Sequence, residues 1–255
     1  MLKIQAIPAL RDNYIWLIQV ACSQQVLIVD PSEAEPVLDV IKQQSFIPTG
    51  ILITHGCHDH IGGISGILEH YDLPVYGAEI EAIPHLSHAV LGDDSVSIDS
   101  FPSITVIDVP GHTRGHIAFL IDDYLFCGDT LFAAGCGRLH SGDAKAMFNS
   151  LQKIAQLPEQ TNIVCAHEYT LDNLRFTATV EPNNRDIQQR IVDTQIMRAE
   201  NKPSIPSTLA LELATNPFLR CDQPNVIHAV EQFSGKLLTS HQEVFTALRL
   251  WKNQF

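Results

Sequence analysis

Short apolar runs alternate with amphipathic stretches over the first two thirds of the chain. Apolar runs at 26–29, 51–53, 104–107, 124–126 and 163–165 predict buried strands. Between them, apolar positions three or four residues apart predict a helix that begins at Pro36 and two further helices over 61–70 and 144–157. Strands that alternate with helices in this way indicate a layered α/β fold.

The pattern changes after Tyr169. Strand signals become rare, and helical periodicity returns near 184–200 and 240–252, with several prolines between the two segments. Ser240 stands three residues before Glu243, which predicts a capping box at the start of the last helix. We therefore expect a first domain over 1–170 and a smaller helical domain over 171–255.

Composition narrows the classes of protein to which this chain can belong. Its 255 residues are 45% hydrophobic, and no apolar run approaches the ~20 residues that a membrane span needs. The segment 1–8 reads as a first strand rather than a signal peptide, so we expect a cytoplasmic protein. Sixteen basic and 29 acidic residues give a net charge of −13, which argues against nucleic-acid and membrane partners. The six cysteines form no CxxC pair and indicate reduced thiols.

A cluster of metal-binding side chains follows the apolar run 51–53. It reads Thr54-His55-Gly56-Cys57-His58-Asp59-His60. Further candidate ligands follow later predicted strands: His112, with His116 in the same loop, Asp129 and His167. The carboxyl ends of strands lie near one another in a layered α/β fold, so these side chains are expected to converge. The pattern predicts a dinuclear metal site and metal-assisted hydrolysis.

The cluster resembles the Thr-His-x-His-x-Asp-His motif of the metallo-β-lactamase superfamily, and within it the chain resembles glyoxalase II, the hydroxyacylglutathione hydrolases. The resemblance covers nearly the whole length, and the segments near the C-terminus select glyoxalase II. It implies an αβ/βα sandwich with a helical C-terminal domain, and hydrolysis of S-lactoylglutathione to glutathione and lactate. The segments that carry it are 12–16, 29–31, 110–113, 126–132, 135–138, 166–170, 206–209, 216–220 and 249–255.

The resemblance also implies roles for single residues. It implies two divalent metals, for which zinc is the leading candidate and iron and manganese are alternatives. The first would be held by His55, the residue at 57 and His112, and the second by Asp59, His60 and His167, with Asp129 bridging both. Asp59 and Asp129 would serve catalysis, in which a metal-activated water attacks the thioester carbonyl. The implied substrate-binding residues are Arg138, His140, Tyr169, Arg249 and Lys252. A small-molecule glutathione thioester is the expected partner, and we expect a monomer.

Position 57 departs from the family motif, which has histidine there. A Cys57 thiolate is a good zinc ligand, although its charge would make that metal a weaker Lewis acid. Alternatively, Cys57 is a protonated, small apolar side chain and the first metal position is poorly filled. His58 would point to the opposite face of an extended segment, which argues against it as a substitute.

Two other functions remain open from the sequence. A mononuclear iron dioxygenase of glutathione persulfide would need only His55, His112 and Asp129, all of which are present. A glutathione-binding protein that lost turnover through the change at position 57 is the second. Asp30 is either a partner of a ligand histidine or a turn residue at the end of a strand.

Overall fold

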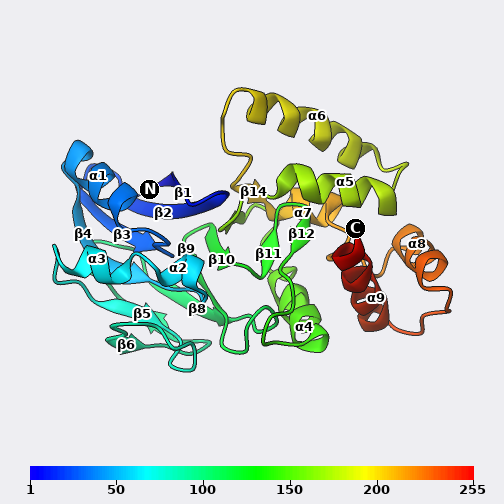
Figure 1. Cartoon of the computed structure of the whole chain (residues 1–255), viewed down its shortest axis with the longest axis horizontal. Coiled ribbons are helices and arrows are strands. Elements are labelled where there is room, and N and C mark those ends of the chain that lie inside the picture. The colour runs from blue at the N-terminus through cyan, green and yellow to red at the C-terminus, as the bar shows by residue number, and fades with distance from the viewer. The chain divides into compact units, whose positions relative to one another are not determined.

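The computed structural model describes residues 1–255 and contains two compact units (Figure 1). The first unit comprises Met1–Asp108 and Arg114–Gly128. The second comprises Val109–Thr113 and Asp129–Phe255.

The first unit contains a mixed sheet in the order β1-β2-β3-β4-β5-β6. Its first three strands are antiparallel: β1 (Leu2–Ala9), β2 (Asn13–Val20) and β3 (Gln25–Val29). The next three run parallel to β3: β4 (Ile47–Leu52), β5 (Val75–Gly77) and β6 (His88–Ala89). The helices of this unit are α1 (Glu35–Gln44), α2 (His58–Ile61) and α3 (Ile64–Leu68).

Four further strands of the first unit are antiparallel in the order β7-β8-β9-β10. They are β7 (Ser95–Val96), β8 (Ile104–Asp108), β9 (Ile117–Ile121) and β10 (Tyr124–Gly128). The predicted strands at 104–107 and 124–126 are thereby confirmed.

The core of the first unit explains why the run 26–29 is apolar throughout. Val26 and Ile28 join a buried cluster with Val37 of α1 and Ile64 of α3. Side chains alternate along a strand, so Leu27 and its neighbour Val29, which are also buried, point to the opposite face. The sheet is therefore covered on both faces, as parallel strands usually are.

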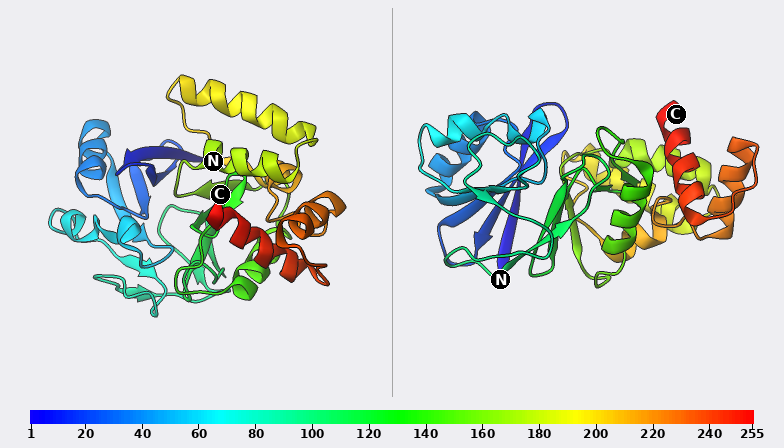
Figure 2. Two further views of the ribbon diagram at one scale, coloured as in Figure 1. Left: turned by 45° about the vertical axis from the view of Figure 1, so that its right-hand side comes forward. Right: turned by 90° about the horizontal axis from the view of Figure 1, so that it is seen from below.

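Helices predominate in the second unit from residue 170 onward. Its strands are the hairpin β11 (Leu131–Phe132) and β12 (Gly135–Cys136), and the antiparallel pair β13 (Asn162–Cys165) and β14 (Ser207–Thr208). Its helices are α4 (Ala144–Ile154), α5 (Thr170–Val180), α6 (Arg185–Ala199), α7 (Leu209–Thr215), α8 (Pro224–Ser234) and α9 (His241–Gln254). Helices α8 and α9 lie side by side (Figure 2). None of the helices in the chain combines the length and apolar character that a membrane span requires.

Most predicted helices are confirmed, with one correction. The helix predicted over 61–70 is confirmed only for the shorter α3, because Gly62 and Gly63 separate α3 from the short helix α2. A Cβ atom on Gly63 would lie 2.5 Å from the backbone of Glu33, so the segment approaches its neighbour too closely for a larger residue. The sequence analysis missed α5, α7 and α8. The boundary at residue 170 between the two predicted domains stays a prediction.

The capping box at α9 is confirmed in half of its bonds. The Ser240 hydroxyl accepts the N–H of Glu243 at 3.2 Å, as predicted. The Glu243 carboxylate instead accepts the N–H of Thr239, one residue earlier than the motif requires. The N–H and then the hydroxyl of Thr239, which both donate to this carboxylate, lower the pKa of Glu243.

A buried ion pair holds the β11–β12 hairpin of the second unit in place. Glu212 of α7 is completely buried and pairs with Arg190 of α6 at 2.5 Å. Its other oxygen accepts the N–H of Ala134 at 2.8 Å, at the tip of the hairpin. Asn216 completes the support by donating to the carbonyl groups of Phe132 and Gly135 at 3.1 and 2.9 Å. A hairpin of two-residue strands is thus fixed mainly by helix side chains.

Removal of one partner of this pair should destabilise the protein strongly. Glu212→Ala leaves the buried guanidinium of Arg190 without its carboxylate, and such a change costs about 3–5 kcal/mol. Glu200→Ala, which breaks an exposed pair with Lys202, should cost less than about 1 kcal/mol. Urea unfolding measures both. Equal effects of the two substitutions would contradict this role of Glu212.

Candidate metal centre

The loop that follows β4 carries the predicted ligands His55, Cys57, Asp59 and His60. Strands β3 and β4 are parallel, so the residues that follow them, Asp30 and Thr54, lie at the same edge of the sheet. Asp30 has φ 49, a left-handed conformation that aspartate tolerates better than most residues. This turn directs its carboxylate toward the ligand loop.

Asp30 connects two histidines that follow β4, His55 and His60. Its Oδ1 accepts the N–H of Thr54 at 2.8 Å, and its Oδ2 accepts the Thr54 hydroxyl at 2.7 Å. The same Oδ2 lies 3.0 Å from Nδ1 of His60. An ionised carboxylate only accepts hydrogen bonds, so Nδ1 of His60 donates and its Nε2 carries the lone pair. Of the two readings of Asp30, the structure places it as a partner of a candidate ligand histidine.

The Thr54 hydroxyl sets the tautomer of His55. Nδ1 of His55 lies 3.1 Å from the Thr54 hydroxyl, whose only hydrogen is already donated to Asp30. Nδ1 of His55 therefore donates to that oxygen, and Nε2 carries the lone pair. Both histidines thus present Nε2 as a potential metal ligand, in the arrangement that buried acceptors usually impose on ligand histidines.

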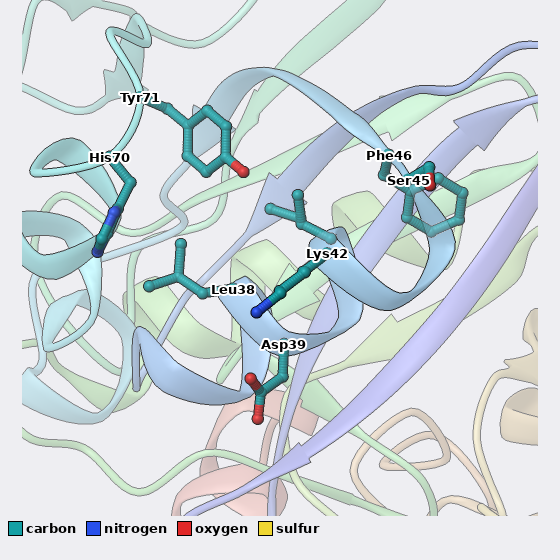
Figure 3. Close-up of a pocket in the computed structure, with 8 residues that line it drawn as sticks. Leu38, Asp39, Lys42, Ser45, Phe46, His70 and Tyr71 are labelled. Carbon is teal, nitrogen blue, oxygen red and sulfur yellow. The ribbon is translucent and has the colours of Figure 1, made fainter.

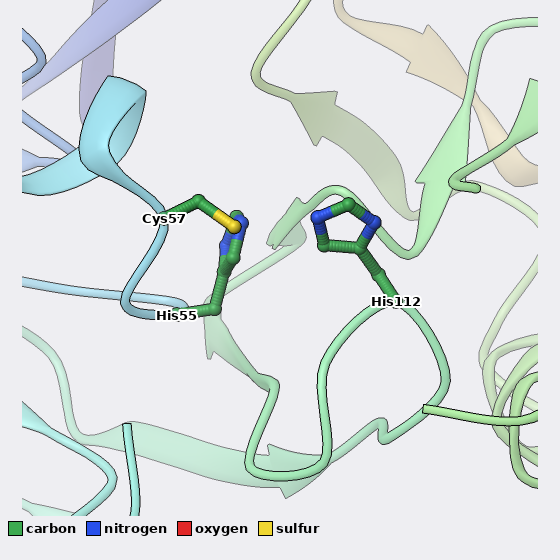
Figure 4. Close-up of side chains that lie close together, drawn as sticks. All are labelled: His55, Cys57 and His112. Carbon is green, nitrogen blue, oxygen red and sulfur yellow. The ribbon is translucent and has the colours of Figure 1, made fainter. Parts of the chain in front are cut away.

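The first unit brings its four predicted ligands close together. The potential ligand atoms of His55 and Cys57 lie within 4.8 Å of each other (Figure 4). Those of Asp59 and His60 also lie within 4.8 Å of each other. Asn13 of β2 donates to the backbone and to the carboxylate of Asp59 at 3.1 and 3.3 Å. His58 begins α2 and is exposed, as expected for a residue that is not a ligand.

The second unit brings the other three predicted ligands together, with the carboxylate of Asp129 facing the imidazoles of His112 and His167. Oδ2 of Asp129 lies 3.7 Å from Nε2 of His112, and Oδ1 lies 3.3 Å from Nε2 of His167. Nδ1 of His112 donates to the carbonyl of Arg138 at 2.7 Å, which leaves the lone pair on Nε2. Each carboxylate oxygen therefore faces one imidazole, as a bridging ligand requires.

A glycine explains how the 135–138 segment reaches these ligands. A Cβ atom on Gly137 would lie 1.9 Å from the carbonyl oxygen of Asp129 and 3.3 Å from Nδ1 of His112. Only glycine permits this approach, which places the Arg138 carbonyl beside His112.

The predicted substrate-binding residues all lie in the second unit, in different settings. Tyr169 stacks on His167 with ring centroids 4.6 Å apart, and His140 lies edge-on to His112 at 6.0 Å. Arg138 is exposed. Arg249 is buried and donates to the carbonyl of Cys136 at 2.8 Å.

Lys252 differs from Arg249 in its surroundings. Its amine lies over the rings of Phe176 and Phe255 and donates to the carbonyl of Asp172 at 3.2 Å. Burial, followed by the nearby charge of Arg249, lowers the pKa of Lys252 to about 8. The amine is therefore mostly protonated at neutral pH and loses its proton as the pH rises through about 8.

Three further residues support the predicted ligands; His116 is one of the candidate ligands of the sequence, whereas Asn13 and Glu81 are not. Asn13 holds Asp59, His116 stacks on His55 with ring centroids 4.5 Å apart, and Glu81 accepts the backbone N–H of Gly56 at 2.9 Å. A buried asparagine inside an apolar strand is a signal that would have found Asn13. The position of Glu81 in an irregular segment gives no comparable signal.

A separate pocket of about 490 Å³ lies on the first unit and contains none of the predicted site residues (Figure 3). It is lined by Leu38, Asp39, Ile41, Lys42, Ser45, Phe46, His70 and Tyr71.

Comparison with known proteins identifies the family. Residues 10–167 match the model of the metallo-β-lactamase superfamily, and residues 168–255 match the model of the hydroxyacylglutathione hydrolase C-terminus. A hydroxyacylglutathione hydrolase from Nitrosomonas europaea is 46% identical over 100% of this chain and 97% of its own length. One from Aliivibrio fischeri is 48% identical over the full length of both chains. The chain belongs to the hydroxyacylglutathione hydrolase family.

Solved structures confirm the predicted fold class. The BLEG-1 B3 metallo-β-lactamase superposes with a TM-score of 0.67 at 22% identity, over 85% of this chain and 99% of its own. ETHE1 from Myxococcus xanthus gives a TM-score of 0.66 at 20% identity, over 99% and 98% of the two chains. The fold is that of the metallo-β-lactamases, with a helical C-terminal region, and this fold family implies divalent-metal binding.

The donor set of this chain fits such a metal. Imidazole, thiolate and carboxylate are the ligands that zinc takes in proteins, and imidazole also suits iron. The buried acceptors Asp30 and the Arg138 carbonyl hold histidines with Nε2 as the lone-pair donor, so the residues are prepared to bind a cation.

Asp30→Asn should weaken metal binding. The amide would place a donor against groups that already donate, and loss of such a partner costs about 10- to 100-fold in metal affinity. We expect Asp39→Asn, an exposed carboxylate of α1, to have no effect. Titration of the metal-free protein with zinc against a chelator measures this. Unchanged affinity in Asp30→Asn would contradict the role of Asp30.

Proposed function

We propose that this chain hydrolyses S-(2-hydroxyacyl)glutathione thioesters to glutathione and a 2-hydroxy acid. S-lactoylglutathione, which yields lactate, is the proposed substrate, and the reaction is the second step of methylglyoxal detoxification. The observation that carries this proposal is the full-length likeness to hydroxyacylglutathione hydrolases, which includes the separate C-terminal region. Cytoplasmic location and a monomeric state stay predictions.

We propose that the seven predicted ligands hold two divalent metals, zinc first, with iron or manganese as alternatives. His55, Cys57 and His112 would hold one metal, and Asp59, His60 and His167 the other, with Asp129 between them. Support comes from the donor types, from the tautomers of His55, His60 and His112, and from the two imidazoles that face Asp129. Metals bound there would lower the pKa of a water molecule to about 7 and polarise the thioester carbonyl.

Cys57 is proposed as a ligand rather than a packing residue. Its backbone is extended just before α2, its side chain is half-buried, and its sulfur lies beside the imidazole of His55. Burial raises the pKa of Cys165 to about 12, so that thiol is protonated and serves packing. Cys57 has no comparable enclosure.

The remaining residues of the chain bind and orient the substrate in this proposal. Asp59, which Asn13 holds in place, orients the attacking water. Arg138, His140 and Tyr169 lie beside metal ligands and would contact the peptide part of the thioester. Arg249 and Lys252 would supply positive charge for a glutathione carboxylate. Arg249 also holds the backbone at Cys136, because it donates a hydrogen bond to the carbonyl of that residue.

The mononuclear dioxygenase is the weaker alternative. It requires only His55, His112 and Asp129, but it leaves the match of residues 168–255 to the hydrolase C-terminal model without a reason. Oxygen consumption with glutathione persulfide would favour it.

A matched pair of substrates tests the proposed function. S-lactoylglutathione should be hydrolysed at least about 100-fold faster than a simple acyl thioester, because polar groups of the pocket stay unpaired without the peptide. Elemental analysis of the same sample should find about two metals per chain if the dinuclear assignment holds. Equal rates on both thioesters would contradict the proposed substrate-binding residues. No hydrolysis at full metal occupancy would contradict the proposed activity.

The lowered pKa of Lys252 predicts a pH dependence of substrate capture. As pH rises through about 8, the amine loses its proton and its attraction for a carboxylate, so kcat/KM should fall by about 10- to 100-fold, the value of a hydrogen bond to a charged group. Lys252→Arg keeps its charge in this range, and its kcat/KM should not show this decline. Parallel pH profiles of the two proteins would exclude Lys252 as the titrating group.

A further inference from the structure

The carboxylate of Glu81 connects two loops of the first unit. Glu81 is buried between β5 and β6, in a turn closed by its own N–H to the carbonyl of Ala78. Its Oε2 accepts the N–H of Gly56 at 2.9 Å, and its Oε1 accepts the N–H of Gly115 at 2.7 Å. Hydrogen bonds to an ionised acceptor are stronger than neutral ones, so this bridge holds both loops firmly.

Both partners of Glu81 are glycines, and the contact requires it. A Cβ atom on Gly56 would lie 2.9 Å from the carbonyl oxygen of Glu81. A Cβ atom on Gly115 would lie 2.8 Å from Oε1 of Glu81 and 2.4 Å from Cγ1 of Ile80. Larger residues at either position would force the carboxylate away from the backbone that it binds.

The bridge acts on His55 from two directions. Gly56 stands between His55 and Cys57, so its anchored N–H fixes the backbone from which both side chains project. Gly115 precedes His116, whose ring stacks on that of His55 with an interplanar angle of 19°. Ile117 then donates to the carbonyl of Thr54 at 3.0 Å, which joins the same two loops again.

We propose that Glu81 is a positioning residue that holds His55 and Cys57 in the arrangement that binds the metal. Asp30, through Thr54, orients the ring of His55, whereas Glu81 fixes the peptide that follows it. Gly56 is the most flexible residue type and would otherwise leave the spacing of the two ligands loose. The proposal rests on the proposed metal site, but not on the identity of the thioester.

The test compares Glu81→Gln with Glu79→Gln. The glutamine keeps the size of the side chain but replaces one acceptor oxygen with an NH₂ group, which cannot accept a backbone N–H. Glu79 is exposed in the same segment and loses the same charge, so it is the matched control. Metal-free protein is titrated with cobalt(II), and zinc affinity is measured against a chelator. Cys57→Ser identifies the sulfur-to-cobalt absorption band.

We expect Glu81→Gln to bind zinc about 10- to 100-fold more weakly than the wild type, as for other residues that orient ligands. The sulfur-to-cobalt band should shift or weaken, and Glu79→Gln should match the wild type in both measurements. Wild-type zinc affinity and an unchanged cobalt spectrum in Glu81→Gln would overturn the proposal. A lower melting temperature with unchanged metal binding would also overturn it, because Glu81 would then serve stability alone.

Hydrogen exchange separates this proposal from the proposed function. In the metal-free protein, peptides that contain Gly56 and Gly115 should exchange faster in Glu81→Gln than in Glu79→Gln. Equal exchange would overturn the positioning role even if the wild type binds metal and hydrolyses the thioester. Faster exchange with weaker zinc binding would support it even if S-lactoylglutathione proves not to be the substrate.

Discussion

The ligand loop of the first unit depends on one carboxylate, that of Asp30. It accepts hydrogen bonds from the backbone N–H and the hydroxyl of Thr54 and from the imidazole of His60. Through the Thr54 hydroxyl it also fixes the ring of His55. A carboxylate that only accepts hydrogen bonds assigns both tautomers at once. The left-handed backbone at Asp30 is a strained conformation for a residue with a Cβ atom, and the parallel pairing of β3 and β4 keeps it in place.

In the second unit, buried polar side chains of helices hold the hairpin that lies beside the predicted ligand Asp129. Its hairpin β11–β12 is too short to be stable by its own ladder, and it is held by the buried Glu212, with Arg190 and Asn216 around it. Asp129 stands at the entrance of this hairpin and the Arg138 carbonyl just after its exit. A buried ion pair contributes little net stability compared with an apolar core, but it fixes a backbone position well. We infer that ligand geometry, rather than stability, is what this polar interior provides.

The sequence predicts the first unit better than the second for physical reasons. Apolar runs such as 26–29 specify strands because both faces are buried, and the ligand types gather where strands end. Helix α5 was missed because polar and small residues such as Asn173 and Thr177 are buried in it, where they bind the hairpin backbone instead of following an apolar period. The role of Glu81 could not be predicted, since it depends on the approach of two distant glycines. The domain boundary at 170 and the site roles remain predictions.

Gly56 and Cys57, two adjacent residues of the ligand loop, are best understood together. A thiolate adds a negative charge and a longer bond to the metal position, by ~0.2–0.3 Å compared with imidazole. A loop that accepts this difference needs a backbone that can shift, which glycine supplies, and then a restraint that removes the freedom again. Glu81 is that restraint, because its carboxylate binds the N–H of Gly56, between the predicted ligands His55 and Cys57. The hydrogen bonds of β4 do not fix the backbone of Gly56 or Cys57, because this strand ends at Leu52. The spacing of His55 and Cys57 is therefore set by Glu81 across the loop, and less by the strand that precedes it.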